Sequence, residues 1–515
     1  MMRTPSLKSG DAMALYRQLP GSHDPLELYR KLSRNGAPNT ALFENAAGQA
    51  MILAAAAVRV TCRGGEVVVT SLGDGGPDVI AALADKLAER VSNRAEGELR
   101  LRYERSTSSD LEERLLAPSP FDVLRALTRF PSSSPEEKFT VFCGGVVAFD
   151  HVDLFEELPQ PASDPLGYPD FEFWVGEGLV LVEPGGKARI LSTFFGSDDA
   201  GRATRAYHSA VARLDALYER TQAKLEVPEE VRPTANDLEP EPDLNDAEYA
   251  DLVTRVKENI AAGDVYQIVP SRTFRVPCAD PLAAYARQRK SDPSPYMFFV
   301  SGAEHILFGA SPETSVKVWR EGGTPMVEVK PIAGTRRRGE TADEDDRLEA
   351  DLRLDVKEGA EHIMLVDLAR NDVARVSTPG SRRVAKLLTV ERYARVMHLV
   401  SSVTGELAQG LDCLDALQSC LNVGTLSGAP KLRATELLRG YEATKRGPYG
   451  GAVGWLSGTG EMDTGVIIRS AVVKNGQAYV RAGAGVVHDS DPRAEMEETK
   501  QKASAVLAAL RGETR

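Results

Sequence analysis

Four glutamates are spaced so that their carboxylates can act together. Glu358 and Glu361 lie three residues apart in one predicted helix, and Glu495 and Glu498 repeat that spacing in the last predicted helix. Residues three apart share one face of a helix, so each pair presents two carboxylates in the same direction. If the two faces converge, their oxygens offer the hard ligands that Mg²⁺ prefers. The alternative is two solvated faces whose charges are paired with neighbouring lysines.

Two glycine-rich segments, residues 424–431 and 483–485, can bring backbone N–H groups close to an anion. The first departs from the phosphate-loop pattern, because Ala429 and Pro430 stand where that pattern requires Lys and Ser or Thr. Pro430 at the first position of a predicted helix still leaves free N–H groups that suit a carboxylate or a phosphate. A plain junction between loop and helix explains the segment equally well.

Three single residues each allow a structural and a functional interpretation. Arg469 is the single cation in a predicted apolar strand at residues 464–473, and a buried arginine needs a carboxylate or an anionic ligand. His398 is bracketed by apolar residues, so it is either a hydrogen-bonded core residue or a catalytic one. Glu313, in the sequence Ser-Pro-Glu, is either a turn carboxylate or a general acid.

The composition limits the classes of protein to which the chain can belong. Its 515 residues include 75 acidic and 62 basic side chains, so the formal net charge is −13. This balance disfavours nucleic acid as the main partner, whereas local Arg, Lys and N–H groups can still hold a small anion. Five scattered cysteines and an N-terminus without the apolar run of a signal peptide favour a soluble, cytoplasmic protein.

The order of the predicted elements favours an α+β fold. Asn245 begins a predicted helix with capping-box spacing, and a strand is predicted at residues 265–269. Asn475-Gly476 predicts a hairpin, and a helix over about residues 494–510 closes the chain. Because strands do not alternate regularly with helices, we expect a large antiparallel β-sandwich core with surrounding helices rather than a doubly wound fold.

A composition shift predicts two domains. Between residues 226 and 244, prolines and acidic residues crowd together with few apolar side chains, which is typical of an extended connector. We therefore expect an N-terminal domain over residues 15–225, an acidic, proline-rich connector over residues 226–244, and a second domain over residues 245–515.

Five motifs occur in order at residues 332–336, 365–372, 424–431, 449–451 and 483–485. Together they resemble the chorismate-utilising enzyme family, and most closely the large subunits of anthranilate synthases. The resemblance is strong over residues 246–510 and weaker over residues 37–182. It implies an anthranilate synthase-like fold and a lyase that converts chorismate and ammonia to anthranilate and pyruvate in tryptophan biosynthesis. The second domain would bind chorismate and carry catalysis, and the first would be regulatory.

Carried over by motif, the resemblance assigns roles to individual residues. Glu361 and Glu498 would ligate Mg²⁺, with the other two glutamates reaching the metal directly or through water. Glu313 would protonate the departing 4-hydroxyl, and His398, with Thr425 close by, would serve the elimination of pyruvate. The residues implied to line the substrate are Gly334, Thr335, Tyr449, Arg469, Gly483, Ala484 and Gly485.

Two positions separate the branches of the family. The para-aminobenzoate branch uses a lysine nucleophile where this chain has Ala333, and the isochorismate branch uses a lysine base where it has Gln267. Both residues favour attack by free ammonia and thus anthranilate as the product. Because no glutaminase domain follows the last helix, we expect a separate glutamine amidotransferase subunit (anthranilate synthase component II), in an assembly of two large and two small subunits.

The resemblance also implies feedback inhibition by tryptophan. The Leu-Leu-Glu-Ser motif of the family appears as Leu-Phe-Glu-Asn at residues 42–45, and residues 295–297 match its second half. A carboxylate would meet the ammonium group of tryptophan, and apolar side chains would enclose its indole. The residues implied are Glu44, Asn45, Pro295, Tyr296 and Met297. A hairpin edge without a ligand is the alternative.

Two other functions are compatible with the motifs. An aminodeoxyisochorismate or aminodeoxychorismate synthase would stop before the elimination step. A protein of another class, an inactive subunit that only senses tryptophan, would need neither Glu313 nor His398, and both are present.

Overall fold

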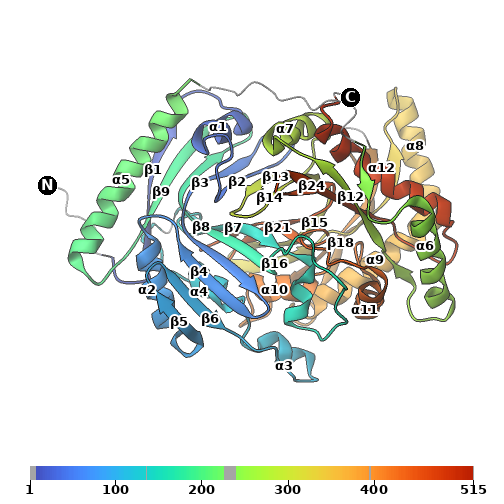
Figure 1. Ribbon diagram of the computed structural model, residues 1–515, viewed down its shortest axis with the longest axis horizontal. Helices are drawn as coiled ribbons and strands as arrows, with labels where there is room; N and C mark the ends of the chain where they lie inside the picture. The colour runs from blue at the N-terminus through green and yellow to red at the C-terminus, as the bar shows by residue number, and fades with distance from the viewer. Residues whose placement is uncertain (1–6, 135, 225–238, 394–395, 514–515) are drawn as a thin grey trace.

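The computed structural model describes residues 7–134, 136–224, 239–393 and 396–513. Antiparallel strands form two large sheets, and helices lie around them (Figure 1). This is the α+β sandwich that the sequence predicts. Among the described helices, none combines the length and apolar character needed to cross a bilayer.

In the first sheet, each strand pairs with the next in a continuous antiparallel order. The order is β1 (Ala12–Leu19), β9 (Ala188–Phe195), β8 (Phe171–Val182), β3 (Ala50–Arg63), β2 (Thr40–Glu44), β13 (Tyr296–Ser301), β14 (Ile306–Ser311), β23 (Ser470–Lys474), β24 (Gln477–Gly483), β12 (Ser271–Pro277) and β10 (Glu241–Pro242).

The second sheet shares β3 and β8 with the first. Its order is β5 (Val91–Ala95), β6 (Glu98–Arg102), β4 (Glu66–Ser71), β3, β8, β7 (Phe142–Val147), β21 (Ala452–Ser457), β22 (Met462–Val466), β15 (Thr314–Glu321), β16 (Thr324–Val329) and β19 (Val396–Glu406). Both β17 (Ile332–Arg337) and β18 (Arg383–Arg392) also pair with β19, and β11 (Gln267–Ile268) pairs separately with β20 (Gly428–Ala429).

The two shared strands form one corner of the sandwich. The register between β3 and β8 shifts between Leu53 and Val58, opposite Gly176 and Gly178. Bulges and glycines let a strand bend sharply, so each strand leaves one sheet and continues in the other. Trp174 and other buried aromatic side chains fill the space between the sheets.

The chain also crosses between the sheets at a second corner. It passes from β14 to β15 through Pro312 and Glu313, and from β22 to β23 through residues 467–469. The amide of Val466 donates to the carbonyl of Glu313 at 2.9 Å, which ties the two crossings together. The prediction of one continuous strand over residues 464–473 is therefore wrong, because this strand breaks where it changes sheets.

Strands from both sides of the expected connector pair with each other. β2 pairs with β13, and β7 pairs with β21, so both halves of the chain contribute to each sheet. The division into domains at residues 226–244 stays a prediction. Most of that connector, residues 226–238, lies outside the described part of the chain.

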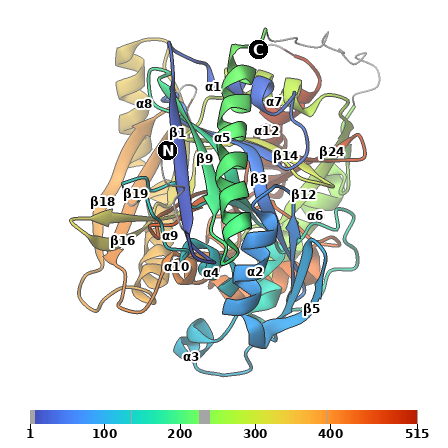
Figure 2. The ribbon, with the colours of Figure 1, turned by 90° about the vertical axis from the view of Figure 1, so that its left-hand side faces the viewer.

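The helices cover the outer faces of the sandwich. α5 packs on β9 and β1 at one side, whereas α6 and α12 lie at the opposite side (Figures 1 and 2). Their bounds are α1 (Pro25–Leu32), α2 (Gly76–Lys86), α3 (Leu111–Leu116), α4 (Asp122–Thr128), α5 (Ala200–Gln222), α6 (Asp246–Ala261), α7 (Pro281–Ser291), α8 (Ala342–Leu354), α9 (Val356–Ala374), α10 (Cys413–Cys420), α11 (Lys431–Tyr441) and α12 (Pro492–Leu510).

Local signals in the sequence were most accurate where one side chain fixes the backbone. Asn245 and Glu248 form the expected capping box at the start of α6. Asn475 and Gly476, both with positive φ, form the turn of the β23–β24 hairpin. The strand expected at residues 265–269 is shorter, because only Gln267 and Ile268 find ladder partners in β20.

Candidate functional site

Glu313 lies at the second corner with its carboxyl group buried. The Thr425 hydroxyl donates to Glu313 Oε1 at 2.7 Å. Burial raises the pKa of Glu313 to about 7, and the hydrogen bond from Thr425 and the charges of Lys502 and Arg469 oppose the rise only in part. A carboxyl group that still holds its proton near neutral pH is suited to act as a general acid.

His398 projects from β19 beside β17, where it pairs in register with Thr335. Its Nδ1 lies 2.9 Å from the carbonyl oxygen of Gly334. A carbonyl only accepts hydrogen bonds, so we assign the proton to Nδ1 and a free lone pair to Nε2. Nε2 is buried without a hydrogen-bond partner in the described structure. Burial also lowers the pKa of His398 to about 4, so the ring is neutral at pH 7.

Gly334 connects the histidine to the acidic helix α9. Its φ is +70°, and a Cβ at this position would lie 3.2 Å from Glu358 Oε2 and 3.0 Å from Leu352 Cδ1. A side chain here would crowd this carboxylate, so glycine allows the backbone of β17 to approach α9. The β17 segment therefore lies between His398 and the glutamates.

Arg469 occupies the turn between β22 and β23, with a φ of +48°. Its Nη1 lies 3.6 Å from Asp292 Oδ2, and its carbonyl accepts a hydrogen bond of 2.7 Å from Gln288 Nε2. The sequence left open a carboxylate or an anionic ligand as the partner. The structure provides the carboxylate at a loose distance, so other guanidinium N–H groups remain able to bind an anion.

Tyr449 and Gly483, two of the residues expected to line the substrate, lie close to each other. A Cβ on Gly483 would lie 3.2 Å from the Tyr449 hydroxyl oxygen and 2.6 Å from the Pro270 carbonyl oxygen. Only glycine fits here, and the close packing brings backbone N–H and C=O groups to the surface of the site. Gln267 packs in the same way against Gly485, where a Cβ would lie 3.0 Å from its Nε2.

The two pairs of glutamates face one another across α9 and α12. Burial raises the pKa of Glu361, Lys357 opposes this, and the charges of Glu358, Glu495 and Glu498 raise it further. Carboxylates on both helices are therefore close enough to repel each other. Glu495 is buried, and its Oε2 has no hydrogen-bond partner in the described structure.

These carboxylates fit a divalent cation, although they are not closed into a ligand cage. Glu361 lies 3.8 Å from Lys357 and Glu498 lies 2.6 Å from Lys502. Within the described residues, no group of three or more His, Cys, Asp and Glu side chains is close enough to hold a metal. Glu495 Oε2 is nevertheless a buried oxygen without a partner in the described structure, and other carboxylates lie near it. A bound Mg²⁺ would neutralise this concentration of negative charge.

Lys502 is a site residue that sequence reasoning missed. Its ammonium group donates to the Gly483 carbonyl at 3.1 Å and pairs with Glu498 at 2.6 Å. It therefore joins the acidic helices to the glycine segment. Its spacing from Glu498 was a signal, but an ordinary solvated pair on a helix has the same spacing. Lys500, two residues earlier, forms such an exposed pair within α12, with Glu497 at 3.6 Å.

The five residues that the sequence predicts to bind tryptophan line one separate cavity of about 360 Å³. These residues are Glu44, Asn45, Pro295, Tyr296 and Met297. Aromatic side chains of Phe139, Trp319 and Trp455 also line it. Charged side chains of Lys138, Lys317, Glu461 and Asp463 line it as well, so the cavity suits a small ligand that has both aromatic and charged groups.

The polar groups of this cavity are partly engaged within the protein. Glu44 Oε1 accepts hydrogen bonds from the Tyr285 hydroxyl at 2.5 Å and from Arg289 Nε at 2.8 Å. Its Oε2 is buried without a partner in the described structure, so it can still accept from a ligand. Asn45 Oδ1 accepts instead from the amides of Ala47 and Gln49, which stabilises its own turn.

Comparison with known proteins gives a consistent result. Residues 85–508 match the family model described as chorismate binding enzyme. The chain is 42% identical to anthranilate synthase component 1 of Vibrio cholerae, over 98% of this chain and 97% of the relative. It is 44% identical to the pyocyanine-specific anthranilate synthase component 1 of Pseudomonas aeruginosa, over 90% of this chain and 87% of the relative.

Solved structures share the fold. Anthranilate synthase component I from Streptococcus pneumoniae aligns with a TM-score of 0.67 and 30% identity, covering 90% of this chain and 92% of that one. The menaquinone-specific isochorismate synthase from Escherichia coli aligns with a TM-score of 0.68 over 99% of this chain and 96% of that one. At 19% identity, the second alignment supports the fold alone.

Proposed function

The chain belongs to the family of chorismate binding enzymes, and from this premise we infer that it acts as the large subunit of an anthranilate synthase. The observation that carries the inference is 42% identity to such a subunit over 98% of the chain. The reaction converts chorismate and ammonia to anthranilate, pyruvate and water. It is a lyase reaction, because pyruvate leaves by elimination as the ring becomes aromatic.

We assign the proton transfers to the two buried groups with opposite pKa shifts. Glu313, protonated near neutral pH, donates its proton to the departing 4-hydroxyl of chorismate. His398 is neutral with a free Nε2, so it can take the ring proton that is lost during elimination of pyruvate. Because the Thr425 hydroxyl donates to Glu313, we assign Thr425 to orienting the acid rather than to assisting the histidine.

We assign binding of the two substrate carboxylates to groups at the opposite walls of the site. Arg469, Tyr449 and the backbone of Gly483, Ala484 and Gly485 would receive one carboxylate, with Gly334 and Thr335 lining the ring. Glu361 and Glu498 would hold Mg²⁺, with Glu358 and Glu495 beside them. When bound, this ion would neutralise the carboxylate that faces the acidic helices.

The nucleophile is free ammonia. Ala333 has no amine with which to attack chorismate, and the amide of Gln267 cannot deprotonate water. Ammonia is mostly protonated at neutral pH, so delivery by a glutamine amidotransferase subunit explains how the site receives it. We propose that two such subunits assemble with two copies of this chain, in the cytoplasm. Five free, buried cysteines are consistent with that reducing compartment.

We further propose that the cavity beside Glu44 binds tryptophan and that α7 transmits its effect. Tyr285 and Arg289 of α7 hold Glu44, whereas Gln288 of the same helix holds the carbonyl of Arg469. A ligand that draws Glu44 toward its ammonium group would shift α7 and displace Arg469. A product of the pathway would thereby weaken chorismate binding without entering the active site.

The test of the proposed function is product identification. The purified chain is incubated with chorismate, Mg²⁺ and an ammonium salt, and anthranilate is followed by its fluorescence. We expect anthranilate and an equal amount of pyruvate. An aminated product that retains its enolpyruvyl group would instead identify an aminodeoxyisochorismate or aminodeoxychorismate synthase. Tryptophan binding with no turnover of chorismate would identify an inactive sensor.

A further inference from the structure

Behind the substrate-binding segments lies a buried ion cluster to which no role has been assigned. Its members are Glu442, at the C-terminal cap of α11, and two arginines, Arg446 and Arg481. The three side chains are 6%, 3% and 8% exposed as whole residues. Burying ionised groups is costly unless all of them are paired and hydrogen-bonded, so the cluster needs a compensating benefit.

Every oxygen of the Glu442 carboxylate is engaged. Oε1 accepts from Arg446 Nη2 at 2.7 Å and from the amide and hydroxyl of Ser271 at 2.9 and 2.8 Å. Oε2 accepts from Arg446 Nε at 2.8 Å and from Arg481 Nη2 at 2.9 Å. Burial alone would raise the pKa of Glu442, but the two arginines hold that pKa below its ordinary value.

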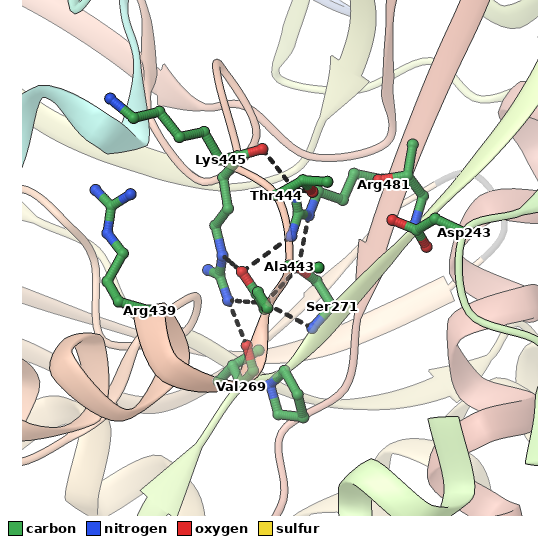
Figure 3. A network of polar contacts seen from close by, with 12 residues as sticks. Asp243, Val269, Ser271, Arg439, Ala443, Thr444, Lys445 and Arg481 are labelled. Atoms are coloured by element: carbon green, nitrogen blue, oxygen red, sulfur yellow. Dashed lines mark hydrogen bonds and ion pairs between the residues drawn. The ribbon is translucent and has the colours of Figure 1, made fainter. Parts of the chain in front are cut away.

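The arginines extend from this carboxylate to other segments of the chain. Arg446 donates to the carbonyls of Leu426 and Val269 at 2.6 and 2.7 Å. Arg481 donates to the Lys445 carbonyl at 2.8 Å and the Thr444 hydroxyl at 3.2 Å. In Figure 3, Val269 and Ser271 on one segment and Arg481 on β24 face the centre of this network.

Each of these segments carries a residue of the proposed site one to three positions away. Leu426 follows Thr425, Val269 lies two residues after Gln267, and Arg446 precedes Tyr449 by three residues. Arg481 precedes Gly483 by two residues, and Ser271 pairs with Gly483 in the β12–β24 ladder. One carboxylate thus fixes the relative positions of four segments that are distant in the sequence.

The cluster is also unbalanced in charge. Two guanidinium groups face one carboxylate, which leaves one net positive charge in a buried position behind Tyr449. The charges of Arg446 and Arg481 both lower the pKa of the Tyr449 hydroxyl, against the rise that burial causes. A fixed positive charge below the site favours an anionic ligand even though the whole chain is acidic.

We propose that Glu442 is a positioning residue for the anionic substrate: it orders Arg446 and Arg481, and through them the Thr425, Tyr449 and Gly483 segments that contact the substrate. This role rests on the proposed function. It differs from catalysis because Glu442 acts only through the segments that it holds. It also differs from a pure charge effect, since neutralising Glu442 would by itself increase the positive field and strengthen binding of a dianion.

The test compares Glu442→Gln with a matched control, Glu177→Gln. Glu177 is likewise buried and paired with an arginine, Arg213, at 3.1 Å, but it lies on β8 outside the proposed site. We measure kcat and KM for chorismate with saturating ammonium and Mg²⁺, and the melting temperature with and without chorismate.

For Glu442→Gln, we expect kcat/KM to fall about 100-fold, mainly through a higher KM, as for displaced binding groups. Because chorismate binds more weakly to this variant, it should also raise the melting temperature of the variant less than that of the wild type. Glu177→Gln should lose stability but keep its KM and its response to chorismate. Glu442→Asp, which keeps the charge, should recover part of the loss. If Glu442→Gln does not fold, Arg481→Lys carries the same expectation, because it keeps the charge but cannot reach both Thr444 and Glu442.

Equal changes of KM in Glu442→Gln and the control, or a lower KM in Glu442→Gln, would overturn the positioning role. Wild-type turnover is recorded in the same assay. A failure of the proposed function would therefore appear in the wild type itself, whereas a failure of the positioning role appears only in the comparison of variants.

Discussion

Burial is the main cause of the protonation states that the proposed roles of Glu313 and His398 require. A buried site disfavours charge, so it raises the pKa of Glu313 to about 7 and lowers the pKa of His398 to about 4. At neutral pH the acid therefore still holds its proton in a large fraction of molecules, and the base is free of its proton. Burial is thus the largest cause of both shifts, and it leaves one group with its proton and the other without.

The first prediction concerns the pH dependence of turnover. Because Glu313 must be protonated to act, kcat should fall as the pH rises through about 7, the pKa of this carboxyl group. Glu313→Gln should lower kcat by about 10²–10⁴-fold, the usual contribution of a general acid. A pH–rate profile in the wild type and variant checks this. A flat alkaline limb in the wild type would contradict it.

Glu313 also affects stability. Its pKa is raised from an ordinary 4.5 to about 7, so its favourable contribution is complete below pH 4.5 and is lost as the pH rises through 7. This pKa difference corresponds to about 3 kcal/mol in the free energy of unfolding. Glu313→Gln, which stays neutral, should therefore melt at a higher temperature than the wild type at pH 8 but not at pH 4.5. The reverse order would count against a buried, proton-bearing Glu313.

The sequence could single out Glu313 and His398 as candidate site residues, because motifs mark them. Their environment could not be identified in this way. The tautomer of His398 depends on the Gly334 carbonyl, 64 residues away in the chain. Lys502 was missed for the same reason, since its contact with Gly483 is made through space.

At the scale of elements, α7 connects the cavity beside Glu44 with the candidate active site. It contacts Glu44 through Tyr285 and Arg289, and it contacts the turn of Arg469 through Gln288. The sequence could not predict the contact with Arg469, because it predicted residues 464–473 as an unbroken strand, and the contacts with Glu44 join residues more than 240 positions apart. Hydrophobic periodicity detects apolar residues in a strand but not the point at which a strand changes sheets.

The second prediction tests this connection. Gln288→Met keeps the volume of the side chain but removes the hydrogen bond to the Arg469 carbonyl. We expect tryptophan to bind as before, whereas the concentration needed for half-inhibition should rise about tenfold, since typical couplings are 1–3 kcal/mol. Calorimetry gives the binding and anthranilate fluorescence gives the inhibition.

The control for this prediction is Lys290→Ala, an exposed position on the same helix, which should change neither quantity. If Gln288→Met binds and responds to tryptophan as the wild type does, α7 is not the route of inhibition.

The third prediction concerns α9 and α12 as a facing pair. Because Glu361 is close to three other carboxylates, Glu361→Gln should remove repulsion and leave the melting temperature in EDTA unchanged or higher. The stabilisation that Mg²⁺ gives the wild type should disappear in the variant. Thermal melts with Mg²⁺ and with EDTA measure both effects.

Glu497→Gln is the matched control on α12, since Glu497 pairs with Lys500 on the exposed side. It should retain the full response to Mg²⁺. A Glu361→Gln variant that is still stabilised by Mg²⁺ would remove Glu361 from the metal site.

At the scale of the whole molecule, the sandwich joins both halves of the chain. The antiparallel core could be predicted from hairpin signals, because these depend on neighbouring residues. The pairing of β2 with β13 and of β7 with β21 could not, since the partners are hundreds of residues apart. The proposed site and the cavity beside Glu44 both lie against strands that cross between the sheets.

The fourth prediction follows from this shared architecture. A fragment of residues 239–513 would leave β13 and β21 without their partners from the other half. Unpaired strand edges promote association, so we expect the fragment to aggregate and to regain solubility when co-expressed with residues 1–238. Size-exclusion chromatography checks this. A monomeric fragment with a cooperative melt would show that the second domain folds alone.

Isotope labelling gives the most direct test of the reaction assigned to this chain. The purified chain is incubated with chorismate, Mg²⁺, ¹⁵N-ammonium and unlabelled glutamine, and the anthranilate is analysed by mass spectrometry. We expect anthranilate labelled with ¹⁵N, and its loss when EDTA is added. Unlabelled anthranilate would show that the chain draws ammonia from glutamine itself, and the absence of anthranilate would refute the assigned reaction.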